Sequence, residues 1–178
     1  MGTIYWATGK FQESKKFFEE GIEIYNDHFP DNHAGFCRGL VELGNVYRTF
    51  GNYEKAKNLL EHSLCLYKKY FSQDYAGFLK NLGSLGLVYS ALGNYEKAIA
   101  ILEQGAVICE IHFPQNHIRI GEILGKLGIV YTELGQYNKA INLFKRSLES
   151  CENHSPNHIG VALGYADLGN VYRMVGDY

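Results

Sequence analysis

The sequence predicts an all-α solenoid, in which pairs of antiparallel helices stack side by side. A five-residue segment returns at steps of 42, 42 and 41 residues, and such a period is typical of units that bury their apolar faces only against their neighbours. Apolar residues inside each unit follow helical spacing, and glycines and short polar residues recur at the expected helix ends. The recurring segments are Leu43-Gly44-Asn45-Val46-Tyr47, Leu85-Gly86-Leu87-Val88-Tyr89, Leu127-Gly128-Ile129-Val130-Tyr131 and Leu168-Gly169-Asn170-Val171-Tyr172.

Two helices are expected in each unit, and we name them helix A and helix B in chain order. A first apolar stripe after Gly51 predicts a helix B over residues 53–70, and a second stripe after Asp74 predicts the helix A of the next unit. A lone helix A is expected over residues 157–175. The apolar positions are Leu59, Leu60, Leu64, Leu66 and Tyr67 in the first stripe, and Phe78, Leu79, Leu82, Leu85, Val88, Tyr89 and Leu92 in the second.

Residues 1–178 are therefore expected to form a single array. It has a partial repeat at 1–30, three repeats at 31–72, 73–114 and 115–155, and a partial repeat at 156–178. Because both ends fall inside a unit, we expect a piece of a longer array. The last helix lacks a helix B and should expose Leu163, Val171 and Val175, so end-to-end self-association is expected.

The helix boundaries carry their own chemistry. A short side-chain acceptor precedes each helix A, where it can pair with a free amide of the first turn. A glycine follows each helix A, where a left-handed backbone ends a helix without a Cβ clash. The predicted caps are Asn32, Asp74, Asn116 and Asn157 before helix A, Gly9, Gly51, Gly93, Gly135 and Gly176 after it, and Asn52, Asn94 and Asp177 before helix B.

Small residues inside the helices predict where the two helices of a unit approach closely. Glycine in a helix interior costs roughly 1 kcal/mol relative to alanine, and close packing can offset that cost. Tyrosines one turn beyond these glycines, and large apolar residues opposite them, should fill the core. The small residues are Gly44, Gly86, Gly128 and Gly169 in helix A, and Ser14, Ala56, Ala98 and Ala140 in helix B; the large ones are Tyr5, Tyr47, Tyr89, Tyr131, Tyr172, Phe18, Leu60, Leu102 and Phe144.

Composition excludes several classes of protein. The formal net charge is -2 and the pI is near 6.4, so no basic stripe is present to capture nucleic acid. No run of about 18 apolar residues occurs, so no membrane contact is expected. The four cysteines form no Cys-x-x-Cys pair, and a reducing, cytoplasmic location is expected.

The recurring positions resemble a known family. Leu82, Leu85-Gly86, Tyr89, Gly93, Tyr95, Ala98 and Leu102 resemble the tetratricopeptide repeat (TPR), and the turn Gly93-Asn94-Tyr95-Glu96-Lys97-Ala98 with its 42-residue period is most similar to the kinesin light chain type. The resemblance implies a right-handed superhelix whose A helices line a concave groove. It also implies a function in holding a peptide or protein partner without catalysis.

The resemblance places the partner-binding residues on the A helices. Charges alternate along these positions around an apolar middle at Leu87 and Ile129, which favours an amphipathic peptide. Extra glycines such as Gly83 and Gly125 are either tolerated by long buried helices or let a bound backbone approach. The expected groove residues are Arg38, Glu42, Asn45, Arg48, Lys80, Ser84, Leu87, Glu122, Lys126, Ile129, Glu133, Asp167, Asn170 and Arg173.

Metal binding and catalysis are both disfavoured. Paired histidines such as His112 and His117 recur in the loops between units, but no carboxylate or cysteine completes a zinc ligand set. Every Cys or His candidate lies at a repeat position or in a loop shared by several units, whereas an active site needs one convergent cluster, and no Ser-centred elbow or phosphate-binding loop is present. We therefore expect no metal, no cofactor and no enzyme activity. The function expected is a protein-protein interaction scaffold, and the alternative is a ligand- or peptide-responsive sensor module of a larger protein.

Overall fold

The structure is a computed structural model that describes residues 11–28, 34–114, 117–155 and 158–176. Within these ranges the chain forms eight α-helices and no strand, which confirms the predicted all-α class. The helices are α2 (Phe11–His28), α3 (Ala34–Thr49), α4 (Tyr53–Tyr70), α5 (Tyr75–Ala91), α6 (Tyr95–His112), α7 (Ile118–Glu133), α8 (Tyr137–His154) and α9 (Ile159–Val175).

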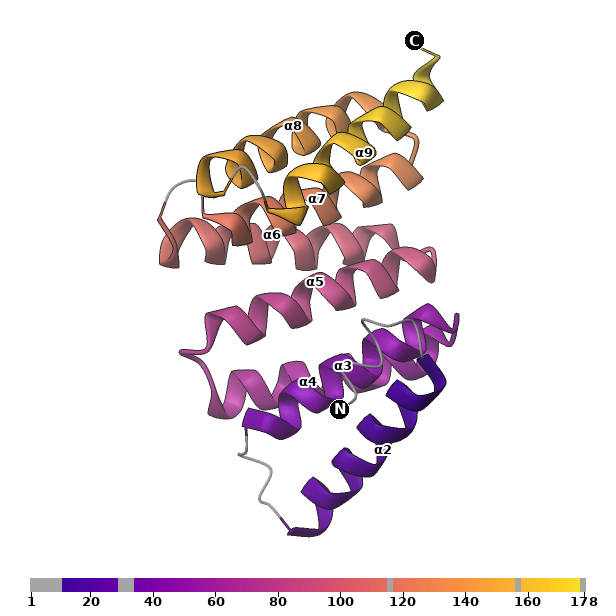
Figure 1. The fold of residues 1–178 in the computed structure, drawn as a ribbon, viewed down its shortest axis with the longest axis vertical. Helices are drawn as coiled ribbons and strands as arrows, with labels where there is room; N and C mark the ends of the chain where they lie inside the picture. The colour runs from indigo at the N-terminus through magenta and orange to yellow at the C-terminus, as the bar shows by residue number, and fades with distance from the viewer. Residues whose placement is uncertain (1–10, 29–33, 115–116, 156–157, 177–178) are drawn as a thin grey trace. The chain divides into compact units, whose positions relative to one another are not determined.

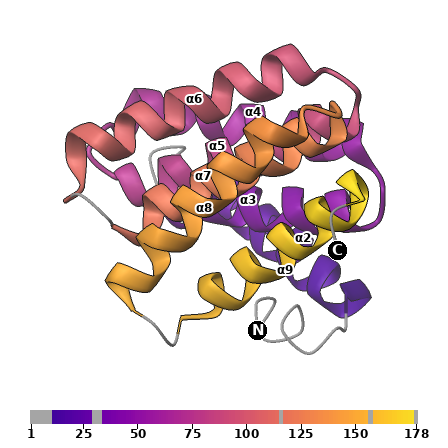
Figure 2. The same ribbon diagram turned by 90° about the horizontal axis from the view of Figure 1, so that it is seen from above.

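The chain divides into two compact units, and each is described by itself. Unit 1 spans Met1–Val88 and unit 2 spans Tyr89–Tyr178, so the last residues of α5 belong to unit 2. In unit 1, α3 contacts both α2 and α4 (Figure 1). In unit 2, α7 contacts α6, α8 and α9, and α8 lies beside α9 (Figure 1 and Figure 2). Helices α3, α5, α7 and α9 are the predicted A helices, and α2, α4, α6 and α8 are the B helices.

The predicted glycines end the A helices. Gly51, Gly93, Gly135 and Gly176 have φ values of 74°, 75°, 71° and 84°, a left-handed conformation that costs other residues strain. Gly9 lies outside the described residues. The side chains of Asn52 and Asn94 accept hydrogen bonds from the amides of Lys55 and Lys97 and so cap α4 and α6, whereas Gln136 makes no such bond before α8.

The starts of the A helices differ in part from the prediction. Asp74 caps α5, because its Oδ1 accepts a hydrogen bond from the Gly77 amide at 3.0 Å. Asn32, Asn116 and Asn157 lie outside the described residues. Instead, His117 and His158 cap α7 and α9 through Nδ1, which accepts from the amides of Arg119 at 3.2 Å and Gly160 at 2.9 Å. A neutral imidazole has one acceptor nitrogen, so it can replace asparagine as a cap.

Close packing within the helix pairs follows the predicted small residues. A Cβ built on Gly44 would stand 2.9 Å from Leu60 of α4, and one on Gly128 would stand 2.7 Å from the Phe144 ring of α8. Serines of helix B strengthen these pairs by donating to helix A carbonyls, from Ser63 to Cys37 at 3.0 Å and from Ser147 to Gly121 at 2.7 Å.

Two expectations about burial are corrected. Val171 is not exposed, because it packs against Ala140 and Phe144 of α8 and is only 1% exposed, while Leu163 and Val175 are exposed as predicted. Tyr89 is buried, but Tyr47, Tyr131 and Tyr172 are only half-buried. Tyr5 lies outside the described residues.

Candidate functional site: the helix A faces

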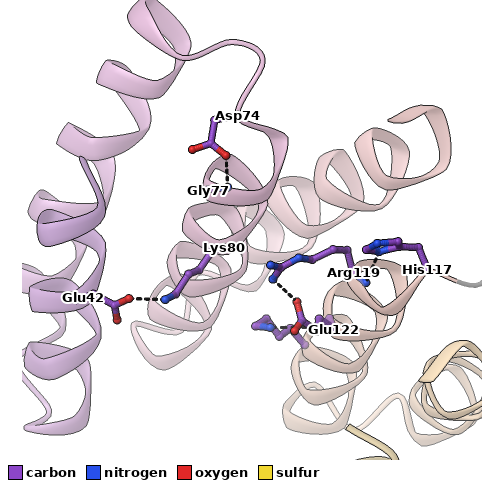
Figure 3. A network of polar contacts seen from close by, with 8 residues as sticks. Glu42, Asp74, Gly77, Lys80, His117, Arg119 and Glu122 are labelled. Atoms are coloured by element: carbon purple, nitrogen blue, oxygen red, sulfur yellow. Dashed lines mark hydrogen bonds and ion pairs between the residues drawn. The ribbon is translucent and has the colours of Figure 1, made fainter. Parts of the chain in front are cut away.

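In unit 1, the predicted partner-facing residues of α3 and α5 are joined by an ion pair. Lys80 of α5 pairs with the Glu42 carboxylate of α3, which links two successive A helices (Figure 3). Arg38 and Lys80 are exposed, Glu42, Asn45 and Leu87 are half-buried, and Ser84 is buried. The face therefore presents charged and amide groups at its edge, with Ser84 withdrawn from its surface.

Arg48 has the least satisfied side chain of this face. It is half-buried near the end of α3, and its Nε is buried without a hydrogen-bond partner. Burial lowers the pKa of the guanidinium, and the nearby Tyr53 works in the opposite direction. A buried N–H without an acceptor costs free energy, and a partner's acceptor can reach this Nε only if the Arg48 side chain moves, because the atom is buried.

In unit 2, the predicted residues of α7 are tied to one another. Arg119 pairs with Glu122 at 2.8 Å, and the Lys126 Nζ donates to the Glu122 carbonyl at 3.2 Å. Figure 3 shows Arg119 beside the capping His117, and Glu122 further along α7. The Glu133 carboxylate accepts a hydrogen bond from the Ser90 hydroxyl. Ile129 packs at the edge of the core cluster formed by Ala140, Phe144 and Val171, so only part of its surface can meet a partner.

On α9, Asn170 and Arg173 are exposed and Asp167 is half-buried. Burial raises the pKa of the Asp167 carboxyl above its ordinary value. Helices α7 and α9 are in contact, so their A faces are neighbours within unit 2.

Sequence reasoning missed two features of these faces. It did not include Arg119, whose ion pair with Glu122 leaves that carboxylate partly neutralised; a spacing of three residues on one helix could have indicated it. It also left two interpretations of Gly125 open, tolerance in a long buried helix or close approach of a bound backbone. A Cβ on Gly125 would instead meet the Ser147 hydroxyl of α8 at 3.3 Å, so this glycine packs against helix B.

The cysteine and histidine groups show no metal cluster in the residues that the structure describes. All four cysteines are free thiols. Burial raises the pKa of Cys37 and Cys109 to about 11, so these thiols stay protonated and weakly nucleophilic near neutral pH. In the same described ranges, no helix is both long and apolar enough to cross a membrane.

The repeating helix pairs define a class of helical repeat protein, and sequence comparison identifies the family. One model of the tetratricopeptide repeat matches residues 35–110 and 119–178, and a second matches residues 1–28. Since these matches cover most of the chain, the protein belongs to the tetratricopeptide repeat family. Comparison with curated proteins gave no match.

Solved structures with similar folds support the same assignment. A putative kinesin light chain of Podosopora anserina with nearly identical TPR-like repeats has 21% identity and a TM-score of 0.75, over 98% of this chain and 83% of that chain. BtubC (BKLC) from P. vanneervenii has 16% identity and a TM-score of 0.77, over 99% and 70%. A Rap protein complexed with competence and sporulation factor has 17% identity and a TM-score of 0.87, over 99% and 48%. These neighbours confirm the predicted solenoid fold class and its likeness to kinesin light chain repeats.

Proposed function

We propose that the chain holds a protein or peptide partner along its A helices, α3 and α5 in unit 1 and α7 and α9 in unit 2. TPR proteins are protein-interaction scaffolds, generally without catalysis, and the fold and family of this chain support that general role. The specific proposal is that the binding residues are the fourteen groove positions named above. It assigns neither catalysis nor a cofactor to the chain.

The observation that supports the proposal best is the half-buried guanidinium of Arg48 on the A helix α3. A partly buried guanidinium on an A face offers a directional donor for a carboxylate or a backbone carbonyl. Around it, Asn45 can hydrogen-bond a peptide backbone, and the half-buried Leu87 offers apolar contact. In unit 2, Lys126 offers a charged group and Ile129 an apolar one, as Arg48 and Leu87 do in unit 1.

A matched pair of charge reversals tests this proposal. Peptides are first selected from a random library on the immobilised chain, and their dissociation constants are then measured by fluorescence anisotropy. Lys126→Glu on the A helix α7 should weaken the selected peptides about tenfold, which corresponds to about 1.4 kcal/mol. Lys145→Glu makes the same charge change on the exposed side of the B helix α8 and should have no effect.

Arg48→Gln provides the second arm, because it removes the guanidinium but keeps a polar side chain of similar length. Peptides with an acidic group or free carboxylate should lose most affinity. Equal binding of every selected peptide to the wild type, Lys126→Glu and Arg48→Gln would refute the helix A faces as the site.

A second candidate is a ligand-responsive regulatory module. The specific observation is the similarity to the Rap protein that was solved with competence and sporulation factor, whose TM-score of 0.87 covers 99% of this chain. For such a module, a bound ligand must change the protein's conformational equilibrium by differential affinity. Hydrogen exchange that slows far from the bound peptide would favour this role, whereas protection confined to the contact residues would favour the scaffold. For both roles we propose a reducing location such as the cytoplasm, given the four free cysteines.

A further inference from the structure

Unit 2 contains a groove away from the predicted partner-facing residues. Helices α6, α7 and α8 line a cavity of about 550 Å³. A second cavity of about 430 Å³ shares Glu110, Leu124 and Arg146 with the first, so the two form one continuous hollow, which we call the α6–α8 groove. Its volume is in the range of ligand-binding clefts, and none of the fourteen predicted groove residues lines it.

A small residue explains why the groove is open. Ala106 of α6 stands at the repeat position that other B helices fill with Ile22, Leu64 and Leu148. Replacing a branched aliphatic side chain by alanine leaves a hollow when the surroundings do not collapse. The floor of this hollow is apolar, with Leu124 and Leu127 of α7 beneath and Val107 of α6 remaining 53% exposed.

The two rims of the groove carry opposite charges at the same spacing. Glu103 and Glu110 lie seven residues apart on α6, and Lys139 and Arg146 lie seven residues apart on α8. Seven residues are two helical turns, or about 10.5 Å along each helix. Beyond Arg146 the second rim becomes acidic at Glu149, which limits the matched region to these two turns.

Among the described residues, the charged groups around this groove form no ion pair with one another, while the Lys139 ammonium lies 5.1 Å from the centroid of the Tyr131 ring. Within the same described part of the chain, Glu103, Glu110 and Arg146 form no ion pair, and the Tyr131 hydroxyl forms no hydrogen bond. The equivalent tyrosine of unit 1 differs, because the Tyr47 hydroxyl donates to Glu19 at 2.6 Å. The groove in unit 2 thus keeps an acidic rim, a basic rim and a phenol available to a partner.

We propose that the α6–α8 groove binds an amphipathic helix of a protein partner, with apolar residues every seven positions and charged flanks of opposite sign. Basic residues on one flank face Glu103 and Glu110, and acidic residues on the other face Lys139 and Arg146. This is the arrangement by which flanking charges set register and orientation in helix packing. The apolar stripe of the partner fills the space left by Ala106. This site is independent of the proposed binding along the A helices.

A synthetic peptide provides the probe. It is a helix of about three heptads, long enough to hold helical structure, with leucines on one stripe, lysines on one flank and glutamates on the other. Its control has the same composition with lysines and glutamates exchanged. Fluorescence anisotropy should show saturable binding of the matched peptide to the wild type, and binding at least about tenfold weaker for the exchanged peptide, since like charges then face each other.

Two variants complete the test. Ala106→Leu restores the residue size of the other repeats, so the chain should stay folded by circular dichroism and unfold at an unchanged or higher urea concentration, while the matched peptide loses at least about tenfold in affinity. Reversal of all four rim charges (Glu103→Lys, Glu110→Lys, Lys139→Glu, Arg146→Glu) should switch the preference to the exchanged peptide.

Three outcomes would overturn the proposal. One is equal affinity of the matched peptide for the wild type and a folded Ala106→Leu. The second is absence of binding by either peptide at about 1 mM, which is weaker than a specific interface sustains. The third is an Ala106→Leu variant that still binds the peptide but no longer self-associates. That result would mean that a second copy of the chain, and not a partner helix, occupies the α6–α8 groove.

Discussion

Asn81 on α5 is fully buried, and neither its side-chain oxygen nor its nitrogen has a hydrogen-bond partner. The equivalent residue on α7 is the buried Ile123. A buried amide without partners costs about 1–3 kcal/mol, whereas an apolar side chain of the same size carries no such penalty.

Replacing this amide should therefore stabilise unit 1. We expect Asn81→Leu to raise the free energy of unfolding by about 1–3 kcal/mol in urea titrations followed by circular dichroism. Asn58→Leu, on the exposed side of α4, is the control and should change it little. A loss of stability in Asn81→Leu would mean that the amide is satisfied in solution.

His117 caps α7 only while its Nδ1 is unprotonated. Burial lowers its pKa, and His154 and Arg119 lower it further, while Glu122 opposes them. Since the folded-state pKa is below the unfolded value of about 6.5, the neutral form is favoured by folding. Its contribution to stability is thus present above about pH 6.5 and is lost as the pH falls from there through the lowered, folded-state pKa.

The corresponding experiment compares His117→Asn with the wild type in urea at pH 7.5 and pH 5. Asparagine can cap the helix at both pH values, so the variant should lose less stability than the wild type on acidification. The same pH dependence in both proteins would show that the cap does not control acid stability.

At the scale of a helix pair, two equivalent glycines differ in their surroundings. A Cβ on Gly128 of α7 would stand 2.7 Å from the buried Phe144 ring, whereas a Cβ on Gly169 of α9 would meet no atom within 4 Å. The first position is filled by helix B, and the second is open in the described structure.

Substitution by alanine should change the free energy of unfolding in opposite directions at these two positions. Gly128→Ala should lower the free energy of unfolding by about 1–3 kcal/mol because the Phe144 ring must shift. Gly169→Ala should raise it by up to about 1 kcal/mol, since alanine is the better helix former. Thermal and urea unfolding check both, and destabilisation of equal size at both sites would contradict close packing at Gly128.

The regular features of these elements were predictable because they repeat. The end of α4 at Tyr70 and the left-handed glycines follow from patterns present in every unit. What the sequence did not reveal depends on contacts between segments far apart in the chain. The burial of Val171, for example, comes from its packing on α8, and the side-chain caps seen at the starts of α7 and α9 are His117 and His158.

The partner-facing residues were predictable only as positions on helices. Their spacing identifies one face of each A helix, but the ion pair between Glu42 and Lys80 depends on how two helices pack. The α6–α8 groove was missed for the same reason. Its single sequence indication is Ala106, which is smaller than its equivalents in the other repeats.

For the molecule as a whole, α9 leaves several large apolar side chains exposed. Ile159, Leu163 and Met174 are 70%, 56% and 52% exposed, and Gly169 has no covering side chain. Leu163 and Met174 stand at the repeat positions of Glu122 and Glu133, so they lie on the partner-facing side of α9, and we expect a second copy of the chain to cover them at high concentration.

Sedimentation velocity over a range of concentrations checks this association. The wild type should form larger species as concentration rises, and Ile159→Lys combined with Leu163→Lys should stay monomeric. The control is Ile24→Lys, which changes an exposed isoleucine of α2 (53% exposed) and should associate as the wild type does. A wild-type chain that stays monomeric throughout would exclude self-association through α9.

The binding of a partner along the A helices is tested most directly by an amide NMR titration with a library-selected peptide. The proposal predicts chemical-shift changes concentrated on α3, α5, α7 and α9, with Arg48 and Lys126 among the affected residues. Shift changes confined to the B helices α2, α4, α6 and α8 would contradict it.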